Sequence, residues 1–332
     1  MKAIVSHKYG SPAVLELRDV DQPALTDDGV LVRVRASSVN PAEWYTVTGT
    51  PYVGRVAMGL LKPKRDVPGV DFAGTVEAVG SGVTQFRPGD EVFGGRSGAF
   101  AEYVCVRQAV VPKPANLTFE QAAAVPTAAI TALQGLRDKG QLQPGQKVLI
   151  NGASGGVGTF AVQIAKAFGA EVTGVCSTRN VDLVRSLGAD HVVDYTREDF
   201  TRSGQRYDLL LDIAGSRSWS ECRRVLDDKA IVVLVGAPKG NRWIGPLGHV
   251  ASVHLASLGA SQKVVFFVAK FSREDLMVLQ ELLEAGKVTP VIDRRYDLSE
   301  VPAALTYLGE GHAQGKVVIT MSASSSGKSF GR

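Results

Sequence analysis

A glycine-rich segment, "NGASGGVG" at residues 151–158, constrains the fold of this 332-residue chain more than any other feature. The apolar run "QKVLI" precedes it, and "TFAVQIAKAFGA" follows it with apolar residues at helical spacing. This order predicts a strand, a tight turn and a helix. A helix that begins directly after such a turn offers unpaired N–H groups and the positive end of its dipole, which together bind a phosphate group.

The glycine spacing refines this prediction. Gly152, Gly155 and Gly158 are one residue further apart than in the common G-x-G-x-x-G pattern. Gly155 and Gly156 would let the backbone approach a pyrophosphate, and Gly158 would let the helix pack closely on the strand. A purely structural turn is the alternative interpretation. We predict a dinucleotide site that includes Ser154, Gly155, Gly156, Val157 and Gly158.

The residues after the second predicted strand indicate which dinucleotide binds. About 20 residues beyond the glycines, an NAD-binding chain carries an Asp or Glu for the ribose 2′-hydroxyl. This chain has "VCSTRN" there, with Ser177 and Arg179 and no acid. A hydroxyl and a guanidinium accept a 2′-phosphate, which an acid would repel, so we predict NADPH. The alternative is that Arg179 is only a solvated residue at the start of a helix.

Two kinds of patterning divide the chain. Up to about residue 120, short strands alternate with Gly and Pro-Gly turns, which predicts a β-rich domain. From there to "VVFFVA", apolar strands alternate with amphipathic helices, as in a doubly wound parallel sheet. We predict an α/β fold with a β-rich domain at 1–120 and 269–321, a Rossmann cofactor domain at 121–268, and a flexible polar tail at 322–332.

Composition excludes several classes of protein. The hydrophobic content of 45% and charged content of 21% are ordinary for a soluble protein, and a net charge of +4 is far from that of a nucleic-acid binder. "VVFFVA" is too short to span a membrane, and the N-terminus becomes polar too early for a signal peptide. Three cysteines without a C-x-x-C pattern give no disulfide framework. We expect a cytoplasmic protein without a nucleic-acid or membrane partner.

Several stretches together resemble the medium-chain dehydrogenase/reductase superfamily. They are "ASSVNPAEWY", "PGVDFAG", "VPTAAITAL", "GASGGVG", "STRN", "LGADHVVDY" and "GKVV", and the likeness covers the whole chain except the tail. The chain is most similar to the zinc-independent quinone oxidoreductase branch, which includes the zeta-crystallin-like and reticulon-interacting homologues and typically has the longer glycine loop. This resemblance implies a GroES-like catalytic domain, an active site in the cleft between the domains, and a homodimer.

The resemblance also indicates where a zinc ion would bind. Alcohol dehydrogenases of the superfamily carry a Cys near the position of Asn40, a Gly-His-Glu where this chain has Gly69-Val70-Asp71, and a third ligand near Thr127. Valine has no donor atom, and an amide or a hydroxyl is a poor zinc ligand. We therefore predict no metal.

A metal-free site favours one class of substrate. A quinone or an α,β-unsaturated carbonyl is already electrophilic, so hydride from a nicotinamide reaches it with only hydrogen-bond help. The resemblance places Asn40, Tyr45 and Tyr52 at the cleft as catalytic candidates. A tyrosine hydroxyl would stabilise the developing enolate or hydroquinone oxygen; alternatively, the tyrosines only line a slot for a flat substrate. Further cofactor contacts are implied at Thr131, Tyr195, Ala214, Gly215, Gly236, Ala237, Phe266, Phe267 and Val268.

The sequence therefore predicts an NADPH-dependent oxidoreductase that transfers hydride to a quinone or an enone. Two alternatives remain open. One is an enoyl-thioester reductase, which would need a path for a phosphopantetheine arm. The other is a non-catalytic NADPH-binding sensor or structural protein that kept the fold.

Overall fold

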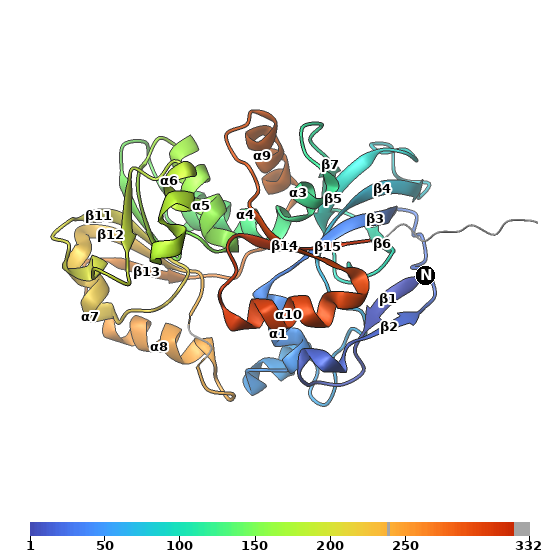
Figure 1. Cartoon of the computed structure of the whole chain (residues 1–332), viewed down its shortest axis with the longest axis horizontal. Helices are drawn as coiled ribbons and strands as arrows, with labels where there is room; N and C mark the ends of the chain where they lie inside the picture. The colour runs from blue at the N-terminus through green and yellow to red at the C-terminus, as the bar shows by residue number, and fades with distance from the viewer. Residues whose placement is uncertain (238–239, 322–332) are drawn as a thin grey trace, which may run out of the picture.

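The computed structural model describes residues 1–237 and 240–321, so the predicted tail at 322–332 lies outside the described residues. Two sheets lie side by side along the long axis of the molecule, a parallel sheet at the left of Figure 1 and a largely antiparallel sheet at the right. This arrangement confirms the predicted α/β architecture of a β-rich part and a doubly wound part.

The parallel sheet has six strands in the order β10-β9-β8-β11-β12-β13. The chain leaves β8 in one direction across the sheet and returns to its other side at β11, so the strand order switches between these two neighbours. In open α/β sheets, ligands bind outside the carboxyl ends of the strands at such a switch point. The strands are β8 (Lys147–Asn151), β9 (Glu171–Cys176), β10 (His191–Asp194), β11 (Tyr207–Asp212), β12 (Leu226–Leu234) and β13 (Lys263–Phe266).

The predicted helix after the glycine loop is α5 (Gly156–Ala167). Phe160, Ala161 and Ile164 of α5 are fully buried and belong to the largest hydrophobic core, which also includes residues of α4 (Pro126–Leu133). The helical spacing predicted from the sequence is therefore confirmed. The other helices between residues 119 and 284 are α3 (Phe119–Ala123), α6 (Val181–Ser186), α7 (Trp219–Cys222), α8 (Pro246–Ala256) and α9 (Arg273–Glu284).

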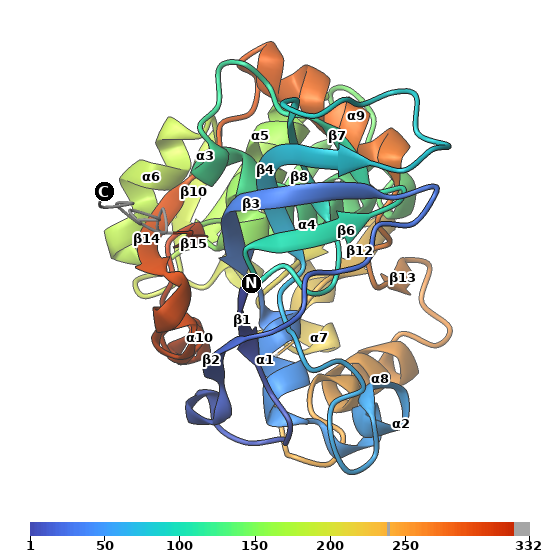
Figure 2. The same ribbon diagram turned by 90° about the vertical axis from the view of Figure 1, so that its right-hand side faces the viewer.

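The second sheet has seven strands, in the order β14-β15-β3-β4-β5-β7 with β6 also paired to β3. Figure 2 looks onto this sheet, with the parallel-sheet part behind it. The strands are β3 (Val30–Val39), β4 (Asp71–Val79), β5 (Glu91–Gly95), β6 (Tyr103–Val106), β7 (Val110–Pro112), β14 (Ile292–Asp297) and β15 (Lys316–Thr320). A separate pair, β1 (Lys2–Val5) and β2 (Glu16–Asp19), and the helices α1 (Pro41–Thr48), α2 (Arg55–Met58) and α10 (Val301–Glu310) complete this part.

The C-terminal strands join the N-terminal sheet. β15 runs antiparallel to β3, with Val317 opposite Val39, and β14 pairs with the outer side of β15. The sheet is thus built from the two ends of the chain. The exact domain limits near residues 120 and 268 stay a prediction.

Two sets of backbone contacts join the halves of the molecule. Gly155 of the glycine loop forms an isolated parallel bridge with Gly315, whose N–H donates to the Ser154 carbonyl at 2.9 Å. On the other side, the N–H groups of Tyr52 and Val53 donate to carbonyls at 242 and 243 at 2.8 and 3.1 Å. The glycine loop is therefore held against the first residues of β15.

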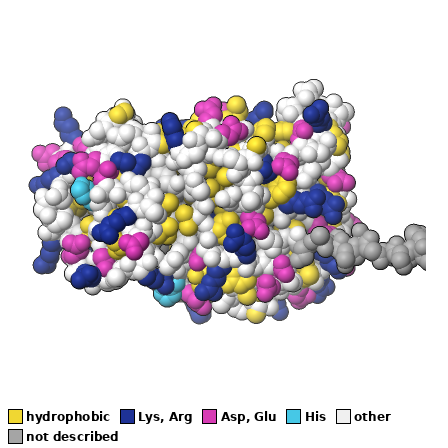
Figure 3. Space-filling view, turned by 45° about the horizontal axis from the view of Figure 1, so that its top comes forward, with side chains coloured by type: hydrophobic (Ala, Val, Ile, Leu, Met, Phe, Trp, Pro, Cys, Tyr) yellow, Lys and Arg dark blue, Asp and Glu magenta, His cyan; other side chains and the backbone are white. Residues whose placement is uncertain are grey.

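Positive and negative side chains are mixed over the surface of the described residues. Lys and Arg side chains alternate with Asp and Glu over the face shown in Figure 3, instead of gathering by sign. Within residues 1–237 and 240–321, no helix has both the length and the apolar character required to cross a bilayer.

Candidate active site

The glycine loop has the geometry of a phosphate-binding turn. Gly152 has a φ of 93°, a left-handed conformation that side chains rarely adopt, while Gly155 is extended and precedes the first residue of α5. The first N–H groups of a helix have no intrahelical partner. A Cβ on Gly158 would lie 2.1 Å from the Gly152 carbonyl oxygen, so this glycine is needed for the close contact between helix and loop.

A cavity of about 490 Å³ opens beside this loop, at the carboxyl ends of β8, β9 and β11. The residues that line it come from the loop, from the segment after β9, from the turn after β11, and from residues 311–313 near the C-terminus. It brings together six of the predicted cofactor residues: Ser154, Gly155, Ser177, Arg179, Tyr195 and Ala214.

Arg179 is exposed at the rim of this cavity. One of its guanidinium N–H groups donates to the His312 carbonyl at 2.8 Å, which leaves its other N–H groups for a ligand. The neighbouring Asn180 amide donates to the hydroxyls of Ser154 and Ser177 at 2.9 and 3.3 Å. These bonds connect the glycine loop to the segment that carries Arg179.

Sequence reasoning missed several polar residues in and beside this cavity, among them Asp212 and Arg217. Asp212, buried at the end of β11, accepts hydrogen bonds from the Asn151 amide at 2.8 Å and from the Gly215 N–H at 2.9 Å, so it holds the turn after β11. Burial raises the pKa of the Asp212 carboxyl. Arg217 lines the same cavity, with its guanidinium 5.7 Å from the centre of the Phe200 ring. Both could have been found from the sequence, because Asp212 ends an apolar strand of a parallel sheet and Arg217 follows it closely.

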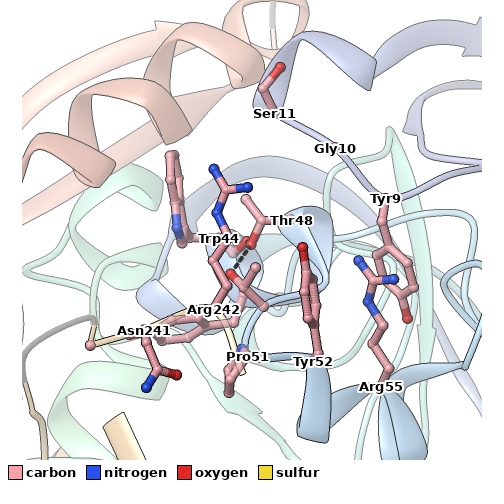
Figure 4. Close-up of a pocket in the computed structure, with 13 residues that line it drawn as sticks. Tyr9, Gly10, Ser11, Trp44, Thr48, Pro51, Tyr52, Arg55, Asn241 and Arg242 are labelled. Atoms are coloured by element: carbon pink, nitrogen blue, oxygen red, sulfur yellow. Dashed lines mark hydrogen bonds between the residues drawn. The ribbon is translucent and has the colours of Figure 1, made fainter. Parts of the chain in front are cut away.

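Both candidate tyrosines, Tyr45 and Tyr52, line a second cavity of about 530 Å³. Figure 4 shows Tyr52 there, close to Arg55. The Arg55 guanidinium lies 4.4 Å from the ring centre of Tyr9 and 4.6 Å from that of Tyr52. Tyr52 also meets Trp243 edge to face, with 5.4 Å between ring centres. Such a wall of aromatic rings and a cation suits a flat, polarisable molecule. Burial raises the pKa of Tyr45, so its phenol stays protonated as a hydrogen-bond donor.

Asn40 lines neither of these two cavities but is buried in a polar network at the end of β3. Its amide nitrogen donates to Asp71 at 3.0 Å, its amide oxygen accepts from the Lys316 ammonium, and its backbone N–H donates to Glu43 at 2.8 Å. All four side chains are at most 3% exposed. Sequence reasoning identified Asn40 as a site residue and missed Glu43 and Lys316.

Asp71 is the centre of this network. Its carboxylate accepts hydrogen bonds from the N–H and hydroxyl of Thr127, at 2.9 and 2.5 Å, and from the Ser38 hydroxyl at 2.8 Å. The Lys316 ammonium lies 3.5 Å from the same carboxylate. The carboxylate therefore ties β3, β4, α4 and β15 together.

Glu43 is the second acid of the network. Burial, and after it the negative charge of Asp71, raise its pKa to about 7, while the positive charge of Lys316 opposes both effects. One carboxyl oxygen accepts the Asn40 N–H, while the other has no hydrogen-bond partner among the described residues. Glu43 is thus a buried acid that changes charge near neutral pH.

The remaining predicted cofactor residues line neither cavity. The Thr131 hydroxyl donates to the Thr127 carbonyl at 2.7 Å, within α4. Phe266 and Val268, at the end of β13, are exposed. The predicted cofactor residues that line neither cavity are Thr131, Gly156, Val157, Gly158, Gly215, Gly236, Ala237, Phe266, Phe267 and Val268.

Comparisons with known proteins agree with this fold. Residues 26–115 match the alcohol dehydrogenase GroES-like domain family, and residues 187–319 match the zinc-binding dehydrogenase family. The 2-methylene-furan-3-one reductase of Solanum lycopersicum is 36% identical over 96% of this chain and 79% of its own. The NADPH-dependent alkenal/one oxidoreductase, chloroplastic, of Arabidopsis thaliana is 33% identical over the same shares. The solved quinone oxidoreductase of Coxiella burnetii has a TM-score of 0.84 at 30% identity, covering 97% of this chain and 99% of that chain.

Two glycine substitutions distinguish an effect on folding from an effect on NADPH binding. In Gly158→Ala, the new methyl group would overlap the Gly152 carbonyl, so we expect a loss of stability of about 1–3 kcal/mol. In Gly155→Ala, the nearest atom lies 3.7 Å away, so the protein should fold normally while the methyl group obstructs the loop. We expect weaker binding of NADPH, measured by fluorescence titration, with an unchanged unfolding curve. Wild-type affinity in Gly155→Ala would show that no dinucleotide approaches this loop.

The raised pKa of Glu43 predicts a pH-dependent stability. Its value is about 7 in the folded protein and 4.5 for an ordinary Glu, so the unfolded state ionises first as the pH rises. The contribution of Glu43 to stability is full below the ordinary value and disappears as the pH rises through about 7. Between about pH 5 and about pH 8, the free energy of unfolding of the wild type should fall by about 2–3 kcal/mol more than that of Glu43→Gln. Urea unfolding at both pH values measures this, and identical pH dependences would contradict it.

Proposed function

Because this chain belongs to the medium-chain dehydrogenase/reductase superfamily, among its quinone and enone oxidoreductases, we propose that it transfers hydride from NADPH to a quinone or an α,β-unsaturated carbonyl. One observation carries this proposal: a glycine loop at the start of α5 opens into a cavity with Ser177 and Arg179, while an aromatic cavity lies between the two halves of the chain. One cavity suits a dinucleotide, and the other suits a flat acceptor.

The choice of NADPH over NADH rests on the residues after β9. Ser177, Arg179 and Tyr195 lie around the same cavity, and among the described residues the Arg179 guanidinium bonds only His312, which leaves N–H groups for a ligand. A guanidinium forms paired, charge-assisted hydrogen bonds with a phosphate. The relative from Arabidopsis thaliana is named as NADPH-dependent, which agrees with this choice.

The nicotinamide supplies the hydride when the cofactor is bound, so the protein has to orient the acceptor and stabilise the charge that develops on its oxygen. The protonated Tyr45 phenol is suited to donate a hydrogen bond to an enolate or hydroquinone oxygen. Tyr52 is held between Arg55 and Trp243, a position that suits stacking on a flat ring. We assign donation to Tyr45 and packing to Tyr52.

The superfamily includes zinc enzymes, but the residues at the corresponding positions do not fit a zinc ion. The Thr127 hydroxyl donates its hydrogen to Asp71, the Asn40 amide is bonded at both ends, and Val70 has no donor atom. A zinc site needs lone pairs from several Cys, His or carboxylate ligands, and a buried ammonium at the same place would repel the ion. We propose that the reaction proceeds without zinc.

We also propose a homodimer that forms through the free edge of β13. This strand ends the parallel sheet, so within residues 1–237 and 240–321 no strand pairs with its outer side. Leu255 and Leu258 of the adjoining helix region are 69% and 77% exposed, which offers apolar area for a second copy. The cytoplasmic location stays a prediction, because one relative is named as chloroplastic.

A survey of acceptors tests the proposed function. Purified full-length protein is mixed with NADPH and with quinones, α,β-unsaturated ketones, enoyl thioesters or saturated aldehydes, and the loss of NADPH absorbance is followed. We expect turnover with quinones or unsaturated ketones, before and after treatment with a chelator. Turnover of enoyl thioesters alone would indicate the thioester reductase. Tight NADPH binding without any turnover would indicate a sensor or structural protein.

Replacing Arg179 with Ala tests the cofactor choice. A hydrogen bond to a charged group contributes about 1.5–3 kcal/mol, so the affinity for NADPH should fall roughly tenfold to a hundredfold. The affinity for NADH should stay nearly unchanged, because NADH has no 2′-phosphate. Arg185→Ala is the matched control, since this exposed arginine of α6 does not line the cavity. Equal losses for both cofactors in a folded Arg179→Ala protein would contradict the NADPH assignment.

A further inference from the structure

Lys316, the first residue of β15, has a buried ammonium group. Besides the Asn40 amide oxygen, the ammonium contacts the Val39 carbonyl at 3.4 Å and the Asp71 carboxylate at 3.5 Å. Its three hydrogens are therefore all directed at acceptors of the protein. The ammonium has no donor left for a ligand, so any effect on catalysis must act through these partners.

The partners of Asn40 fix the orientation of its amide. An ammonium only donates and a carboxylate only accepts, so the amide oxygen must face Lys316 and the amide nitrogen must face Asp71. The flipped amide would place its NH₂ group against the ammonium and its oxygen against the carboxylate. One hydrogen of the amide nitrogen bonds Asp71, and the second has no acceptor among the residues the structure describes. This second hydrogen is therefore the one that the amide nitrogen could still donate to a ligand.

The Asp71 carboxylate, which accepts from the Asn40 amide nitrogen, is itself held in place by other hydrogen bonds. Thr127 and Ser38 hold that carboxylate from α4 and β3, independently of Asn40. The Asn40 amide oxygen has Lys316 as its hydrogen-bond donor. Loss of the ammonium would thus leave the amide held from the Asp71 side only, and would leave Asp71 and Glu43 as two buried acids without their nearby cation.

Residues 312–316, the short segment that ends at Lys316, also contact the predicted cofactor site. The stem of Lys316 passes beside the glycine loop, because a Cβ on Gly156 would lie 3.1 Å from its Cδ. One residue earlier, Gly315 bonds Ser154, and His312 accepts the hydrogen bond from Arg179. Residues 312–316 therefore connect the cofactor loop to the Asn40 amide.

We propose that Lys316 is a positioning residue, whose ammonium holds the Asn40 amide in the one orientation that leaves an N–H group for the bound cofactor or substrate. The inference rests on the proposed function and adds to it a residue outside both cavities. Residues 312–316 contact both this amide and the glycine loop.

A double-mutant cycle tests the proposal. In Lys316→Met, we expect kcat to fall by about tenfold to a hundredfold, since small misplacements of site groups have effects of this size, while the affinity for NADPH changes less. If Lys316 acts through Asn40, adding Lys316→Met to Asn40→Ala should reduce kcat little further. Independent losses that multiply in the double variant would overturn the proposal, as would wild-type kcat in Lys316→Met.

Lys113→Met is the matched control. The Lys113 ammonium is also buried, with its side chain 5% exposed, and bonds the carbonyls of Pro114 and Leu117 away from Asn40. Its loss should lower the unfolding midpoint without a comparable loss of kcat. An equal fall of kcat in both lysine variants would show that a general loss of stability explains the effect.

A spectroscopic measurement separates this proposal from the proposed function. In protein with isotope-labelled asparagine, the Asn40 side-chain NMR signal is assigned by its loss in Asn40→Ala. We expect this signal to shift or broaden in Lys316→Met and to stay in place in Lys113→Met, with no substrate present. An unchanged signal in Lys316→Met would overturn the positioning role even in an active enzyme. A wild type without turnover would instead reject the proposed function and leave this measurement valid.

Discussion

The buried carboxylate of Asp71 is the interaction on which the rest of the site depends. It accepts hydrogen bonds from β3, from the start of α4 and from the Lys316 ammonium, and it is fully buried. A buried ionised acid is stable only when hydrogen bonds and an opposite charge compensate its lost hydration. Every segment that supplies a partner is therefore held in place, which fixes the end of β3, the first turn of α1 and the strand that reaches the glycine loop.

This arrangement explains why both cavities lie between the two halves of the chain. The parallel sheet presents the carboxyl ends of its strands at the switch point between β8 and β11, and the glycine loop lies at this edge. The β-rich part supplies Tyr45 of α1 and the nearby Tyr52 on one side, and residues 311–313 on the other. A cofactor along the loop and an acceptor beside Tyr45 would thus share walls that neither half provides alone.

Local sequence patterns predicted the elements of the fold and one part of the site. The glycine loop, α5, and the pair Ser177 and Arg179 were readable because they depend on residues close together in the chain. The network around Asp71 was not readable, since Lys316 and Asn40 are 276 positions apart and meet only through the pairing of β15 with β3. The stretch "GKVV" predicts a strand, but no local pattern shows that its lysine is buried. The roles of the individual site residues stay predictions.

The pairing of β3 with β15 also has a consequence for synthesis of the chain. β3 leaves the ribosome early, and the edge that β15 will cover stays open until almost the whole chain has been made. An open, apolar strand edge can pair with other chains, so this interval is the period of greatest aggregation risk. The parallel sheet has all its strands before β14 and β15 emerge and does not depend on them for pairing. The order of translation thus lets the cofactor half form first, and the active site is completed only by the last strand.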